Sequence, residues 1–279
     1  MVNRPFSTHI NSPEGIDALH DGVPEWMRGS LDDWIVTHLR DSRLQVRDNL
    51  IHSLERLLRA QLSYGKHGFD AFQELFRHIN ANQNLKLDVV EGILRIEGSP
   101  YSGTNELEDI LFESGSKWKV VSDEETGVFS LQERVDETVT LAFEDLAAHS
   151  NDMSHYMVRA WNEAFGRSPN SSETYANSIK AIEAASWPVV IPGNNRATLS
   201  TIIRELEEHP ELFSVSISEA ISGAGIETVR QQMSLVWKGQ TDRHGTAHPI
   251  APSQEAAEQA LFTTLSLCQQ FSRDLIVHD

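Results

Sequence analysis

The stretch WKGQTDRHGTAHPIAPSQEAAE, residues 237–258, predicts a short polar loop between two amphipathic helices in the second half of the chain. Before the loop, apolar residues recur at helical spacing and make one face of a helix apolar. They are Ile226, Val229, Met233, Val236 and Trp237. After the loop, a helix is expected to begin at Ser253, a favourable N-cap, with Glu255 in the first turn, where the helix dipole favours an acid. Its apolar stripe consists of Ala257, Leu261, Leu265, Cys268 and Phe271.

Arg243 and His248 in this loop form a pair suited to phosphodiester cleavage. A guanidinium offers planar, bidentate donors to a phosphate, and an imidazole can move a proton near neutral pH. Neither role requires a metal. The same spacing of Arg and His recurs elsewhere in the chain, so a solvated loop without a catalytic role is the alternative interpretation. Of these pairs, only Arg243 and His248 lie in a predicted loop that contains a glycine, Gly245, and is followed by a capped helix.

The residues RHGTAH, 243–248, resemble the signature of the HEPN superfamily (higher eukaryotes and prokaryotes nucleotide-binding). In that signature an Arg is followed by a polar residue and, a few residues later, by a His. The family carries it before the last long helix of a small helical bundle. The resemblance covers about residues 151–279 and looks most like the abortive-infection C-terminal branch. Pro249 departs from the family pattern, because it restricts the backbone of His248 to extended conformations.

The resemblance implies a homodimer in which two such loops build one composite site that cleaves RNA without a metal or a cofactor. Arg243 and His248 would be its catalytic residues, and His244 would orient the arginine or bind phosphate. In the family, a polar residue on an earlier helix often reaches the loop. Glu183 is the candidate for this supporting role, with a plain surface glutamate as the alternative.

The charge balance argues against general binding of nucleic acid and leaves a selective nuclease possible. The chain carries 23 basic and 41 acidic residues, a net charge of -18 at pH 7, which argues against a protein that coats nucleic acid. Between residues 228 and 250 the balance reverses, and we expect Lys238 and Arg230 to bind RNA there. The single cysteine, Cys268, suits a reducing compartment, and the sequence has no apolar leader and no membrane-spanning run. We therefore expect a cytoplasmic protein with no membrane partner.

The whole sequence predicts a mainly α protein of two parts. Residues 1–150 are expected to form an N-terminal helical region with a small β-hairpin, and to sense a signal or restrain the second part. Residues 151–279 are expected to form a HEPN-like helical bundle.

Several elements of this outline rest on local patterns. A helix is expected after Ser30, because Ser30 and Asp33 resemble a capping box. Residues 85–96 fit either a strand or a helix. Residues 117–121 alternate like a strand, and residues 128–131, after an acidic turn that ends at Gly127, are expected to pair back with it as a hairpin. A helix is expected at about residues 131–149. A non-helical connection is expected at residues 187–195, which contain two prolines.

The expected function is that of a HEPN-type endoribonuclease, a toxin or abortive-infection effector in antiphage defence, with an antitoxin or a phage-derived trigger as a further partner. The alternative is a catalytically silent helical dimer that binds RNA, a nucleotide or a protein through the same loop. The sequence has no GxxxxGK, HExxH, GxSxG or CxxC motif, so the chemistries that depend on these motifs have no support.

Overall fold

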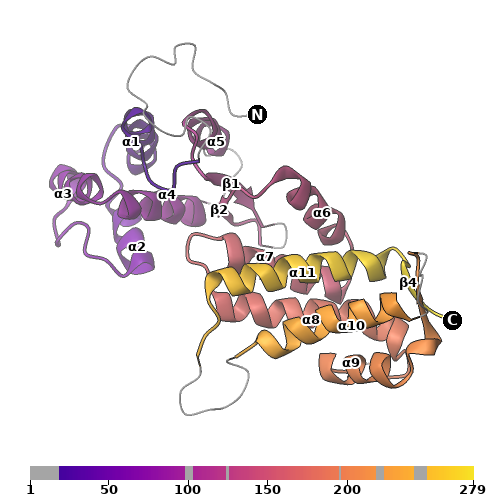
Figure 1. Cartoon of the computed structure of the whole chain (residues 1–279). Helices are drawn as coiled ribbons and strands as arrows, with labels where there is room; N and C mark the ends of the chain where they lie inside the picture. Colours follow the sequence, from indigo (N-terminus) through magenta and orange to yellow (C-terminus); the bar gives the residue numbers. More distant parts are fainter. Residues whose placement is uncertain (1–18, 98–102, 124–125, 195, 218–222, 242–249) are drawn as a thin grey trace. The chain divides into compact units, whose positions relative to one another are not determined.

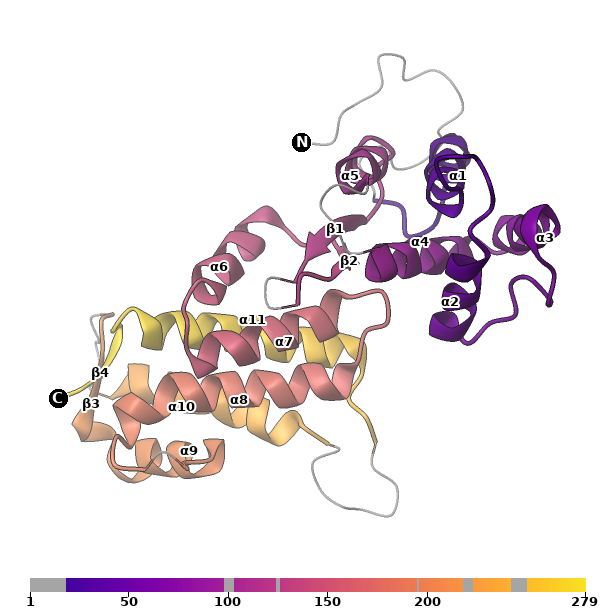
Figure 2. The same cartoon turned by 180° about the vertical axis from the view of Figure 1, so that it is seen from behind.

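The computed structural model describes residues 19–97, 103–123, 126–194, 196–217, 223–241 and 250–279 (Figures 1 and 2). The chain divides into two compact units, Met1–Arg134 and Val135–Asp279. Within the part of the chain that the structure describes, no helix has the length and apolar character that crossing a membrane requires. The predicted class, mainly α with a small hairpin, is confirmed.

The first unit packs helices around one apolar core (Figure 1). The segment whose pattern fits either strand or helix is the helix α4, and its residues Leu87, Val90 and Ile93 are buried. α2 crosses α4 closely, because a Cβ built on Gly92 would lie 2.5 Å from the Leu54 side chain. The helices are α1 (Glu25–Leu39), α2 (Asp48–Leu58), α3 (Gly68–Ala81), α4 (Gln83–Glu97) and α5 (Thr104–Glu113).

The predicted hairpin is confirmed as the antiparallel pair β1 (Trp118–Ser122) and β2 (Phe129–Glu133). Carboxylates meet a backbone N–H on both strands. Glu108 accepts a hydrogen bond of 2.7 Å from the N–H of Val120, and Glu91 accepts one from the N–H of Leu131. Each carboxylate therefore covers one backbone N–H at an edge of the hairpin, where an unpaired group would invite pairing with another strand.

The second unit is a bundle in which α7, α8, α10 and α11 lie side by side (Figure 2). α8 is its central helix: Tyr175, Ile179 and Ile182 join a core with α9 and α10, and Ala181 joins a second core with α7 and α11. Its helices are α6 (Glu137–Ala147), α7 (Asp152–Phe165), α8 (Ser171–Val190), α9 (Leu199–Glu208), α10 (Ala224–Gly239) and α11 (Gln254–Ser272). A short turn of 3-10 helix, η1 (Pro210–Leu212), precedes a small antiparallel pair, β3 (Phe213–Val215) and β4 (Ile276–His278).

Three local expectations were wrong. α1 begins at Glu25 and not after Ser30, because Met27 lies one turn before Leu31 and extends the buried stripe. Residues 129–133 form β2, so that α6 starts only at Glu137, where the Asp136 side chain caps it. α8 continues to Val190 through Pro188.

The continuation of α8 past Pro188 has a physical reason. Pro188 lacks an N–H, which removes one intrahelical hydrogen bond, and it lies in the last turn, so that only two residues of the helix follow it. Val190 is buried in the core, and the N–H of Ile191 donates a hydrogen bond of 2.9 Å to the carbonyl oxygen of Trp187. Burial of the helix end outweighs the local preference against helix.

The division between the units falls at residue 134, whereas the sequence pattern places it at residue 150. α6 packs on α7 and α11, which assigns it to the second unit. Arg273, which follows α11, also pairs with Asp145 of α6 at 2.8 Å.

Candidate functional site

The proposed catalytic residues Arg243, His244 and His248 lie outside the described residues, which end at Thr241 and resume at Ile250. The two described ends are joined, because the Thr241 hydroxyl donates a hydrogen bond of 2.6 Å to the carbonyl oxygen of Ile250. The segment that carries the motif therefore begins and ends at one place in the second unit.

α10 reaches this place in close contact with α8. A Cβ built on Gly239 would lie 2.2 Å from the hydroxyl oxygen of Tyr175, a buried residue in the second turn of α8. A side chain at position 239 would therefore force the Tyr175 ring, or one of the two helices, to shift. Lys238 lies in the last turn of α10 and is exposed, so that its ammonium can reach an anion.

α11 begins at the same place, and hydrogen bonds hold its N-terminus. The Ser253 hydroxyl accepts a hydrogen bond of 3.2 Å from the N–H of Ala256, as the sequence predicts. Gln254 donates a hydrogen bond of 2.9 Å to the carbonyl oxygen of Ala164, near the end of α7. Hydrogen bonds from its own backbone N–H and from Ser253 lower the pKa of Glu255. The ends of α7 and α10 and the starts of α8 and α11 thus meet at one end of the bundle.

Two further carboxylates lie at this end of the bundle: Glu163 in the last turn of α7 and Glu173 in the first turn of α8. Burial, and then the charge of Glu173, raise the pKa of Glu163, while Arg159 acts in the opposite direction. The surroundings of Glu163 therefore disfavour its ionised form. This end of the bundle carries acidic as well as basic side chains and is not a simple basic patch.

Glu183 lies further along α8 and holds the start of α9. Its Oε1 accepts a hydrogen bond of 2.6 Å from the N–H of Leu199. Burial raises the pKa of Glu183, although this hydrogen bond and Lys180 act to lower it. Glu183 follows Tyr175 by eight positions, which is roughly 12 Å along a helix. In the described structure its partner is therefore α9.

Arg230 is likewise engaged within the bundle. Its Nε and Nη2 each donate a hydrogen bond of 2.6 Å to the carboxylate of Glu227, and Glu207 of α9 lies 3.9 Å away. Arg230 precedes Lys238 by eight residues, roughly 12 Å along α10. Of the two cations expected to bind RNA, Lys238 is the one beside the motif segment.

Sequence reasoning did not single out two buried polar side chains in α8. Thr174 is 0 % exposed and Asn177 is 2 % exposed. Their Oγ1 and Oδ1 atoms have no hydrogen-bond partner among the described residues. Buried polar atoms of this kind are uncommon in folded proteins. The sequence signal that could have found them is their i, i+3 spacing, which puts both on one face of a helix.

Among the described residues, no group of three His, Cys, Asp or Glu side chains is arranged to hold a metal ion. Cys268 is fully buried, and burial raises the pKa of its thiol, so this side chain is an apolar part of the core. The chain matches no model of a known protein family, no curated protein and no solved structure.

Proposed function

We propose that the chain is a metal-independent endoribonuclease of the HEPN type and acts as a homodimer. The observation that carries the proposal is the RHGTAH motif at residues 243–248, between two helices of a bundle. The hydrogen bond between Thr241 and Ile250 supports it, because this contact ties both ends of the motif segment to one place. The capped start of α11 adds support, since the N-terminus of a helix favours negative charge.

In the proposed reaction, the 2′-oxygen of a ribose attacks the adjacent phosphorus and the bond from phosphorus to the 5′-oxygen breaks. His248 takes the proton of the 2′-hydroxyl or delivers one to the leaving 5′-oxygen. Arg243 stabilises the charge of the pentacovalent phosphorane, and His244 orients Arg243 or binds phosphate. The products are a 2′,3′-cyclic phosphate and a 5′-hydroxyl.

The dimer would bring two copies of Arg243 and His248 to one composite site. Lys238, in the last turn of α10, would bind a neighbouring phosphate. The first unit would sense a trigger or restrain the nuclease, in keeping with a toxin or abortive-infection effector.

The first experiment is cleavage of total cellular RNA by the purified full chain in EDTA, with mapping of the product ends. We expect cyclic-phosphate ends from the wild type and a loss of at least about a hundredfold in rate for His248→Ala, the scale of general acid–base catalysis. His209→Ala is the matched control. It removes a half-exposed histidine that also follows an arginine at the same spacing, and should leave cleavage unchanged.

Each other outcome contradicts part of the proposal. Loss of cleavage in EDTA would contradict metal independence, and 3′-hydroxyl ends would contradict attack by the 2′-oxygen. If neither the wild type nor His248→Ala cleaves while both bind RNA equally, the loop is a binding element and the chain is not a nuclease.

A further inference from the structure

The turn that follows α1 contains Arg40, an arginine whose guanidinium has fewer polar partners in the first unit than its burial would require. The guanidinium carbon of Arg40 lies 5.0 Å from the centroid of the Phe72 ring, so that one face of the guanidinium is covered by an aromatic ring. Its Nε is buried and has no hydrogen-bond partner among the described residues. Arg40 takes no part in the ion pairs of the described first unit, where Arg47, Arg95 and Arg134 each meet a carboxylate.

The same turn contains Leu44, a leucine whose backbone conformation and exposure both make it an unfavourable choice for stability. Leu44 has φ 62 and is 75 % exposed. Its N–H donates to the carbonyl oxygen of Asp41 at 2.9 Å, and a bridge between Arg40 and Val46 closes the turn. Such a position normally takes glycine or asparagine, because a side chain with a Cβ costs about 1 kcal/mol or more there. Leu44 gains little burial in return for that cost.

Arg40 and Leu44 line one cavity of about 330 Å³. That volume lies at the lower end of the range for small-molecule sites. The wall offers one guanidinium, one carboxylate, two hydroxyls and two aliphatic side chains. The lining residues are Val36, Thr37, Arg40, Asp41, Ser42 and Leu44. Arg40, whose Nε lacks a hydrogen-bond partner among the described residues, and Leu44, which is exposed and has a positive φ, therefore line the same cavity.

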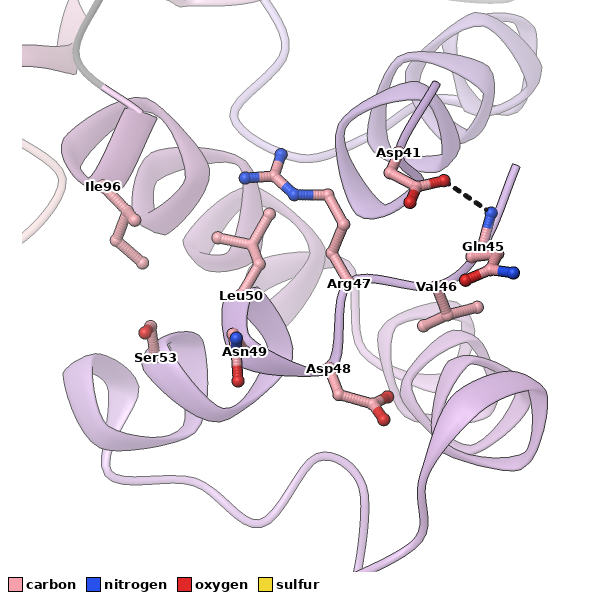
Figure 3. A pocket seen from close by; sticks show the side chains of 9 residues that line it. All are labelled: Asp41, Gln45, Val46, Arg47, Asp48, Asn49, Leu50, Ser53 and Ile96. Carbon is pink, nitrogen blue, oxygen red and sulfur yellow. Dashed lines mark hydrogen bonds between the residues drawn. The ribbon is translucent and has the colours of Figure 1, made fainter. Parts of the chain in front are cut away.

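A second cavity, of about 510 Å³, shares Asp41 with the first and has Arg47 in its wall (Figure 3). Arg47 is already neutralised, because it pairs with Glu97 and donates a hydrogen bond of 3.0 Å to the carbonyl oxygen of His38. Asp41 is also held in place: its Oδ1 accepts hydrogen bonds of 2.9 Å from the N–H groups of Arg43 and Gln45. Of the two cavity arginines, the one that lacks a carboxylate is therefore Arg40.

We propose that the cavity lined by Arg40 and Leu44 binds a small organic monocarboxylate with an apolar chain. The carboxylate supplies acceptor atoms to Arg40 in the geometry that guanidinium groups favour. The apolar chain lies against Val36 and Leu44 and buries the leucine side chain. Asp41 repels any anion, but it repels a dianion such as phosphate more strongly than a monocarboxylate. This site belongs to the first unit and does not depend on the proposed nuclease.

The test is binding of hexanoate to the full chain, measured by ligand-observed NMR with hexanamide and inorganic phosphate as comparison probes. We expect saturable binding of hexanoate, no binding of hexanamide and weaker binding of phosphate. Arg40→Gln should weaken hexanoate binding about tenfold or more. Arg43→Gln removes an exposed arginine of the same turn that does not line the cavity, and should leave binding unchanged.

A second variant separates binding from folding. Leu44→Asn keeps Arg40 and replaces the leucine by a residue that tolerates positive φ, so its thermal stability should equal or exceed that of the wild type. Its hexanoate binding should nevertheless be weaker. The proposal is overturned if hexanoate does not saturate, if Arg40→Gln or Leu44→Asn binds it as well as the wild type, or if phosphate binds as tightly.

Discussion

Lys86 is a buried lysine whose charge is held inside the first unit. Only 1 % of its surface is exposed, and its Nζ donates to Asp32 at 2.6 Å and to Asn80 at 2.8 Å. Removing one partner of a buried ion pair leaves the other charge without compensation and costs about 3–5 kcal/mol. The two partners differ here, because the Asp32 side chain is 25 % exposed and can regain water.

We therefore predict that Asp32→Ala lowers the free energy of unfolding by about 3 kcal/mol, whereas Lys86→Met costs much less because methionine fills the same space. Urea denaturation of the full chain measures both. Equal losses for the two variants would show that the buried ammonium is not the main cost.

Single residues also mark the limit of what sequence could predict. Ser253 as an N-cap and Cys268 as a core residue follow from local pattern, and both are confirmed. The contacts of Glu183 with Leu199 and of Arg230 with Glu207 join separate helices, and no local pattern encodes such a contact. The catalytic assignment of Arg243 and His248 stays a prediction, because both lie outside the described residues.

Among the helices, the crossing of α2 and α4 depends on one glycine. A Cβ on Gly92 would lie 2.5 Å from Leu54, which is fully buried and cannot move freely. Overpacking of this kind costs about 1–3 kcal/mol, while alanine gains about 1 kcal/mol over glycine in a helix interior. The clash outweighs the gain in helix propensity, so Gly92→Ala should lower the free energy of unfolding by about 1 kcal/mol.

Gly29→Ala is the matched control, since it lies inside α1 and its added Cβ would meet nothing within 4 Å. It should raise the free energy of unfolding by about 0.5–1 kcal/mol through helix propensity alone. Chemical denaturation of both variants checks the comparison. A stabilising Gly92→Ala would mean that α2 shifts away from α4 at little cost.

The helices show where periodicity succeeds and where it fails. α7 ends at Gly166 and the Asn170 side chain caps α8, so both boundaries fall at residue types that favour the ends of helices. The α4 segment is apolar on several sides, so its period does not separate helix from strand. Pro188 indicates a break in the helix, and sequence does not show how deeply Val190 is buried beyond it.

At the scale of the whole chain, one carboxylate of the first unit and one of the second have pKa values shifted in opposite directions, so acid should act on these two groups in opposite ways. In the first, hydrogen bonds from Lys66 and Arg77 lower the pKa of Glu74 to about 2. In the second, burial raises the pKa of Glu183 above its ordinary value of 4.5. Folding therefore favours the ionised form of Glu74 and the protonated form of Glu183.

We predict opposite pH profiles for Glu74→Gln and Glu183→Gln in thermal unfolding of the full chain. Glu74 contributes stability above its unfolded pKa, and loses that contribution as pH falls through about 2. Glu74→Gln should therefore be less stable than the wild type near neutral pH, and the difference should shrink on acidification below about pH 4.5.

Glu183→Gln keeps an acceptor for the N–H of Leu199 but removes the charge that burial disfavours. It should be more stable than the wild type near neutral pH, where the wild-type carboxylate is ionised, and the gain should vanish as pH falls below the ordinary glutamate pKa. If Glu183→Gln instead destabilises the chain at neutral pH, the charge of Glu183 strengthens its hold on α9 by more than burial opposes it. The same variant should leave RNA cleavage unchanged if the only role of Glu183 is to hold α9, and should reduce it if Glu183 supports the motif segment as the HEPN resemblance implies.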